Sequence, residues 1–124
     1  MVLAAIAPLL MAAAFAEGAI DAGWSEVART NDGDCELTVH GNGRFFIVSA
    51  TGLERDAAGR YVLTNGDMKP IDWQIRTSGS GRFARYYLPF QWNRDGGEVN
   101  VAVITDRCTL SASFPWERAG TEAQ

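Results

Sequence analysis

The residues between Cys35 and Trp116 fall into short runs in which apolar and polar side chains alternate. A period of two puts successive side chains on opposite faces of an extended strand, so each run has one apolar face. The runs cover residues 35–40, 44–52, 60–64, 71–77, 82–88, 98–105 and 108–114. Glycine-rich pieces such as HGNG and SGSG separate many of them, and glycine tolerates the positive φ of tight turns. Seven short strands over about 80 residues predict an all-β fold, a β-sandwich with one core between two sheets.

An uncharged segment, MVLAAIAPLLMAAAFA, opens the chain. It is shorter than the roughly 20 apolar residues that span a membrane, and its last three residues, Ala-Phe-Ala, match the small-x-small cleavage pattern of a secretory signal. We therefore expect residues 1–16 to be a signal peptide and the mature protein to be periplasmic or secreted, with no membrane span after cleavage. No Lys or Arg follows Met1, which is unusual for a signal. An uncleaved anchor and a buried apolar helix are the alternatives.

The segment that follows the signal has a different pattern. Ile20, Trp24 and Val27 stand at i, i+4 and i+7, which is the spacing of one apolar helical stripe. We expect a short helix or an irregular arm that Trp24 packs against the domain. The predicted order is therefore an arm over residues 17–34, the sandwich domain over 35–116 and a polar tail over 117–124.

The chain has two cysteines, Cys35 and Cys108. Each opens a strand on the inward phase of its run. If every connection reverses the chain direction, the first and seventh strands run the same way, and both cysteines lie at one end of the sandwich. In an exported protein such a pair predicts one disulfide. It would close a loop of about 74 residues, for which the chain-entropy model gives roughly 4 kcal/mol. Two buried free thiols are the alternative.

The order of turns, the VSATGL step and the ending GG-EVNVAV…C…F-P-W resemble small exported bacterial domains of immunoglobulin-like type. The resemblance covers residues 35–116 and implies an immunoglobulin-like β-sandwich as a scaffold. It implies no reaction, because many unrelated functions use this fold. The chain departs from the family where GLERDAAG replaces the Pro-Gly turn that often follows a GL step. The mid-strand cysteines of antibody domains are not matched either.

The sequence offers little catalytic chemistry. His40 is the only histidine, and we expect it to be an exposed turn residue, since no nucleophile motif such as GxSxG accompanies it. The acidic residues are scattered over turns and outward strand positions, and no run has the ligand spacing of a metal site. We therefore predict no enzyme activity, no cofactor and no metal. The net charge of −4 argues against nucleic acid as a partner, because phosphate contacts need a cationic surface.

One segment has the opposite charge. Residues 73–94 carry four arginines and no acid, so the rest of the chain carries −8, which is −4 minus +4. The same segment holds six of the thirteen aromatic residues. Arginine with tryptophan and tyrosine is the composition that interfaces favour. The candidate binding residues are Arg82, Arg85, Tyr86, Trp92 and Arg94. The alternative is ordinary packing with solvated arginines, and we expect Trp73 to point into the core with Ile71 and Ile75.

These patterns predict a non-catalytic exported binding or interaction module that contacts an envelope protein or an anionic glycan through an arginine and aromatic face. A second hypothesis is a structural accessory protein that joins an envelope assembly through a sheet edge. A small hydrolase is a third. A glycan binder should expose coplanar aromatic rings, an assembly protein should leave an unprotected apolar strand edge, and an enzyme should show converging titratable groups.

Overall fold

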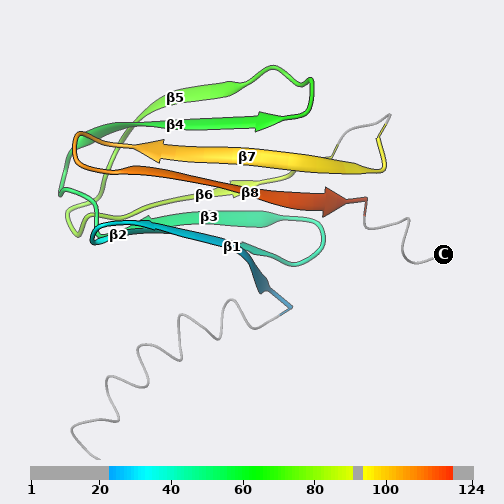
Figure 1. Ribbon diagram of the computed structural model, residues 1–124, viewed down its shortest axis with the longest axis horizontal. Helices are drawn as coiled ribbons and strands as arrows, with labels where there is room; N and C mark the ends of the chain where they lie inside the picture. Colours follow the sequence, from blue (N-terminus) through cyan, green and yellow to red (C-terminus); the bar gives the residue numbers. More distant parts are fainter. Residues whose placement is uncertain (1–22, 91–93, 119–124) are drawn as a thin grey trace, which may run out of the picture.

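The computed structural model describes residues 23–90 and 94–118. The predicted signal peptide, residues 17–22 of the arm, Trp92 and most of the polar tail lie outside these ranges. Eight strands make up the secondary structure of the described residues (Figure 1). They are β1 (Ser25–Asp32), β2 (Cys35–Gly41), β3 (Phe46–Thr51), β4 (Ala58–Asn65), β5 (Ile71–Arg76), β6 (Phe83–Tyr87), β7 (Gly96–Ile104) and β8 (Thr109–Glu117). No helix in the described part of the chain is long and apolar enough to cross a membrane.

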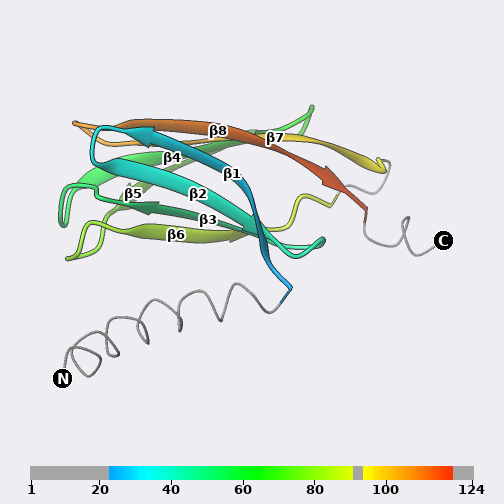
Figure 2. The same cartoon turned by 60° about the horizontal axis from the view of Figure 1, so that its bottom comes forward.

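The strands form two four-stranded antiparallel sheets that pack face to face (Figures 1 and 2). One sheet has the order β1-β2-β3-β6 and the other has the order β5-β4-β7-β8. The seven runs predicted from the period-two pattern are all present, as β2 to β8. The all-β, sandwich-like prediction is therefore confirmed, and the strand count rises to eight.

β1 corrects the expectation of a helix or an irregular arm before Cys35. It pairs antiparallel with β2, with Asp32 opposite Cys35 and Ser25 opposite Gly41. Gly33, with φ 62°, takes a conformation that other residues adopt at a cost, and it lets the chain reverse directly from β1 into β2. The folded unit therefore starts before the predicted boundary at Cys35.

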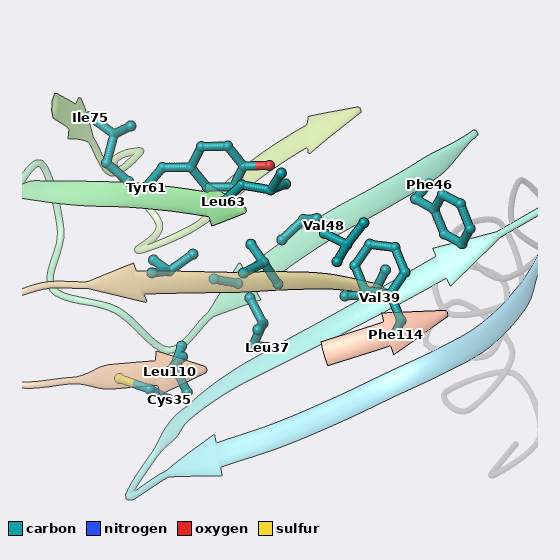
Figure 3. Close-up of a cluster of buried hydrophobic side chains, with 14 of the residues drawn as sticks. Cys35, Leu37, Val39, Phe46, Val48, Tyr61, Leu63, Ile75, Leu110 and Phe114 are labelled. Atoms are coloured by element: carbon teal, nitrogen blue, oxygen red, sulfur yellow. The ribbon is translucent and has the colours of Figure 1, made fainter. Parts of the chain in front are cut away.

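The core consists of the inward-facing residues of both sheets (Figure 3). Aliphatic side chains fill its centre, and the fully buried ones include Leu37, Val39, Val48, Val101, Val103 and Leu110. The rings of Phe46 and Phe114 lie 4.6 Å apart across the interface between the sheets. Each such side chain contributes about 1.5–3 kcal/mol by leaving water. One face of each of the two sheets is therefore buried in the core.

The Cys35–Cys108 disulfide is present, as predicted, and joins the two sheets at the start of β2 and just before β8. The two Cα atoms are 6.4 Å apart, within the range that a disulfide bridges. We call this the disulfide end. At the other end, which we call the distal end, lie the β2–β3 connection (residues 42–45), the β4–β5 connection (66–70) and residues 88–90 after β6. In Figure 1 the distal end is on the right.

Candidate functional site

The predicted arginine and aromatic face is divided by the fold. β6 is an edge strand that pairs only with β3. Because Val48 of β3 is in the core and pairs with Arg85, Arg85 lies on the inward phase of β6. Tyr86 is on the outward phase, is 72% exposed and has its ring 6.5 Å from that of Trp24. These two candidates therefore face opposite sides of one sheet.

Arg85 covers the aromatic rings at the open side between β5 and β6. Its guanidinium lies 5.1 Å from the centre of the Trp73 ring and 5.8 Å from that of Phe83. Trp73 shares the inward phase with Ile75, but it is 46% exposed because β5 is the edge of its sheet. Trp73 therefore faces inward with Ile75, as expected, but it is not buried in the core. Tyr61 lies beneath these rings, and burial raises the pKa of its hydroxyl to about 12.

The remaining candidates lie at opposite ends of the sandwich. Arg82 precedes β6 at the disulfide end, where its backbone N–H donates to Ser78 Oγ. Arg94 lies at the distal end and forms an ion pair of 3.0 Å with Asp67. Trp92 falls outside the described residues. The described candidates thus do not form one face, and a binding role for any of them stays a prediction.

The distal end carries a hollow of about 340 Å³, which we call the large hollow because it is the larger of the two at this end. A hollow of about 610 Å³ lies at the disulfide end, where its lining includes Arg60, Arg76 and Asp106. Three exposed apolar side chains line the large hollow: Phe45 from the β2–β3 connection, and Leu88 and Phe90 from the segment after β6. The end of β8 and the residue after it supply the other wall through Trp116, Glu117 and Arg118. Figure 2 shows the three contributing segments meeting at the distal end of the molecule.

A second hollow at the distal end, of about 260 Å³, adjoins the large hollow, and we call it the small hollow. The two share Gly43, Trp116 and Glu117 as lining residues. Val27 of β1, 40% exposed, lines the small hollow only. Four of the seven exposed large hydrophobic side chains in the described residues, Val27, Phe45, Leu88 and Phe90, therefore line these two hollows.

Asn65 ties the walls of the large hollow together from within the core. Its side chain is 2% exposed. Its Nδ2 donates to the carbonyl oxygen of Pro89 at 3.0 Å and to the Tyr87 hydroxyl at 3.1 Å. Its Oδ1 accepts from Nε1 of Trp116 at 3.0 Å. Because Pro89 and Trp116 are on opposite walls, these bonds fix the shape of the hollow before any ligand arrives.

Two arginines give the large hollow a cationic border. Arg118 lies with its guanidinium 4.9 Å from the centre of the Phe90 ring and donates to the Arg94 carbonyl oxygen at 2.8 Å. Arg44 is held by the β2–β3 connection, where Asn42 Oδ1 accepts from the backbone N–H groups of Arg44 and Phe45 at 2.9 and 2.8 Å. Glu117 is the single acidic residue in the described part of the lining, so the described border has a net charge of +1 in a chain of net charge −4.

Two titratable residues outside the large hollow, Glu54 and His40, lie close to groups of other strands and connections. At the disulfide end, Glu54 accepts from the Thr105 hydroxyl at 2.8 Å and from the Arg107 N–H at 3.0 Å, and the Thr105 bond is the largest cause of its lowered pKa. His40 is an outward residue of β2 with its side chain 15% exposed, near Glu26. The expectation of an exposed turn histidine is therefore wrong, because β1 and β3 flank it.

Sequence reasoning missed the apolar residues of the distal end. A signal was present in Arg44-Phe45-Phe46, because two adjacent aromatic residues in a period-two strand cannot both face the core. Phe46 is buried and Phe45 is 43% exposed. Leu88 and Phe90 flank Pro89 in a connection, where no period indicates which way a side chain points.

No protein-family model, no curated protein and no solved structure matches this chain.

Proposed function

We propose that this chain is a non-catalytic, exported interaction module that docks a partner protein through the distal end. The observation that carries the proposal is the gathering of Val27, Phe45, Leu88 and Phe90 around two adjoining hollows. Contiguous exposed apolar patches on a folded domain mark interaction sites, since scattered apolar residues would be the norm elsewhere. The binding module expected from the sequence is thus retained, and its surface changes from the arginine and aromatic residues chosen within 82–94 to the apolar residues of the distal end, of which Leu88 and Phe90 belong to the same segment.

The strand pairing supports an immunoglobulin-like classification. In such domains strand B pairs with A and E, and strand C pairs with F, which pairs with G. Here β3 pairs with β2 and β6, β4 pairs with β7, and β7 pairs with β8. This equates β2, β3 and β6 with A, B and E, and β4, β7 and β8 with C, F and G. β5 then takes the place of C′, and β1 is an additional edge strand.

A protein partner fits the distal end better than a glycan does. The lining mixes Leu and Val with Phe, whereas sugar rings are bound by stacking on flat aromatic faces. Two of the four edge strands, β6 and β5, fit a docking strand poorly. β6 is only five residues long and carries the inward charge of Arg85, and β5 follows Pro70 and carries the Asp72–Arg60 ion pair. Short strands, prolines and charges protect edges from pairing.

The titratable lining of the large hollow favours binding over catalysis. Its charged side chains are Arg44, Arg118 and Glu117. An arginine keeps its proton in proteins and donates hydrogen bonds, so it serves as an ion-pair partner and not as a general base. Export is supported by the Cys35–Cys108 disulfide, because disulfides persist in oxidising compartments such as the periplasm and the extracellular space.

The test is capture of a partner from an envelope extract by the purified protein, followed by affinity measurement with the purified partner. Leu88→Asp puts a charge into the large hollow and should weaken binding by at least about tenfold. Tyr86→Ser is the matched control, because Tyr86 is more exposed than Leu88 but lies on the outer face of a sheet. Equal binding by wild type and Leu88→Asp, with loss in Tyr86→Ser, would move the interface to the outer face and overturn the proposal.

A further inference from the structure

We infer that the large hollow recognises an apolar side chain that lies beside a carboxylate on the partner protein. The inference rests on the proposed function and names the chemistry of the docked segment. It follows from three features of the hollow: walls that are fixed in advance, an apolar floor and a cationic border.

The fixed walls distinguish the large hollow from a crevice between mobile loops. Asn65 binds the Pro89 carbonyl and Trp116 Nε1 at the same time, and its own side chain is 2% exposed. The β2–β3 connection is held from its other side by Asn42, whose Oδ1 accepts two backbone N–H groups. A site that is ordered before binding avoids the entropy cost of ordering loops and side chains on association.

The apolar floor sets the first part of the specificity. Phe45, Leu88 and Phe90 are 43%, 52% and 38% exposed, so each loses contact with water when a side chain enters between them. Burial of a leucine- or phenylalanine-sized side chain supplies about 1.5–3 kcal/mol. A polar side chain in the same place would lose its water without gaining partners from these three residues.

The cationic border sets the second part of the specificity, which is the preference for a carboxylate. Arg44 and Arg118 line the same hollow as the three apolar residues, so the apolar group and its charge must lie within one or two residues of each other on the partner. The Arg118 guanidinium lies 4.9 Å from the centre of the Phe90 ring, and a guanidinium presents a planar fork of N–H donors. A carboxylate is the anion of proteins that this arrangement suits.

The experiment uses two fluorescent probes that differ in one charge. Anilinonaphthalene sulfonate presents an apolar ring system with an anionic group, and N-phenyl-1-naphthylamine presents nearly the same rings without it. Both are titrated into the purified protein, and amide chemical shifts in an NMR spectrum locate the bound probe. We expect saturable binding of the sulfonate with shifts at residues 43–45, 88–90 and 116–118, and weaker binding of the neutral probe.

Arg44→Gln should weaken binding of the sulfonate probe about three- to fivefold and leave the affinity for the neutral probe unchanged. Arg55→Gln, an exposed arginine at the disulfide end, should change neither. If both probes bind equally and Arg44→Gln has no effect, the carboxylate chemistry is overturned, while partner capture that depends on Leu88 would leave the proposed function standing. If neither probe shifts the amides of the distal end, the hollow is no apolar site and both proposals fall.

Discussion

Single buried polar side chains hold the two ends of the molecule. At the distal end, Asn65 joins β4 to Trp116 of β8 and to Tyr87 and Pro89 at the end of β6. At the disulfide end, the Thr77 hydroxyl accepts from the Ala57 N–H at 2.8 Å and donates to the Glu54 carbonyl oxygen. A buried hydrogen bond adds about 1 kcal/mol, but a partner left unsatisfied costs more. Substitution of Asn65 or Thr77 should therefore lower the stability of the fold, although both side chains are polar.

Asn65→Asp should lower the free energy of unfolding by about 2–4 kcal/mol. An aspartate keeps the acceptor for Trp116 Nε1 but loses the donor to Pro89, and its carboxylate then faces a carbonyl oxygen in a buried site. Urea unfolding followed by fluorescence measures the loss. Asn100→Asp, at an exposed position of β7, should change stability by less than about 0.5 kcal/mol. Equal stability of both variants would show that the Asn65 bonds contribute nothing.

Glu54 should make stability depend on pH. Its pKa is lowered from 4.5 by the Thr105 hydroxyl and the other donors around it. A carboxylate whose pKa is lower in the folded state stabilises the fold above its unfolded pKa, and that contribution is lost as pH falls from about 4.5 through the lowered value. Urea unfolding between pH 3 and pH 7 should show a smaller acid loss in Glu54→Gln than in wild type. Glu98→Gln, an exposed residue of β7, should retain the wild-type dependence, and a Glu54→Gln curve parallel to wild type would contradict the assignment.

Among the elements, β1, β5, β6 and β8 are the edge strands of the described sheets, and β5 and β6 lie on the same side of the sandwich. Each pairs on one side only, so its outer backbone groups can pair with another chain. Arg85 points inward at this side and lies over Trp73 and Phe83. A cation in this position makes cation–π contacts with the exposed rings, and its charge makes the edge unsuitable for an added strand. Arg85 belongs to the arginine-rich segment that first suggested a binding face. In the structure this arginine protects the edge of the sheet.

Arg85→Val should cause association of the protein. The change removes the inward charge and leaves valine beside the half-exposed Trp73, so β6 becomes an apolar edge. Light scattering with size-exclusion chromatography over a range of concentrations measures the mass. Arg85→Lys keeps the charge and should stay monomeric wherever wild type does. A monomeric Arg85→Val at every concentration would show that the arginine does not protect the edge.

At the scale of the whole molecule, the disulfide closes one end of the sandwich and side-chain hydrogen bonds close the other. The Cys35–Cys108 bond links residues 73 positions apart, and Asp32 Oδ2 beside it accepts from the Thr109 N–H at 2.7 Å. The disulfide and the side-chain hydrogen bonds hold the two ends of the sandwich, and aliphatic packing holds the middle of the interface between the sheets. The distal end has no covalent tie among the described residues, and the large and small hollows lie there.

Replacement of both cysteines by alanine should lower the free energy of unfolding by roughly 4 kcal/mol. The loop of about 74 residues that the bond closes restricts the unfolded chain, and that restriction is lost. Urea unfolding of the variant and of wild type with and without reductant gives the comparison. Reduced wild type should resemble the variant. A loss below about 1 kcal/mol would indicate that the two ends are held by packing alone.

The sequence by itself determined the properties that depend on neighbouring residues. The period of two and the turn residues place β2 to β8, and the inward phase of Cys35 and Cys108 predicts their disulfide. β1 was missed because Trp24 and Val27 also fit a helical spacing, and only pairing with β2 decides for a strand. The exposure of Trp73 was not predicted because alternation gives the phase of a residue but not whether its strand lies at an edge.

The tertiary structure alone decided where a ligand could bind. The large hollow takes residues from three segments that are far apart in the chain, at 43–45, 88–90 and 116–118, and its walls are joined by Asn65 from a fourth. The arginine-rich segment 82–94 is contiguous in sequence, but an extended strand sends Arg85 and Tyr86 to opposite faces and separates Arg82 from Arg94 along its length. Local patterns fix strands because strand geometry is local. A concave surface is set by long-range packing, which no single stretch of sequence encodes.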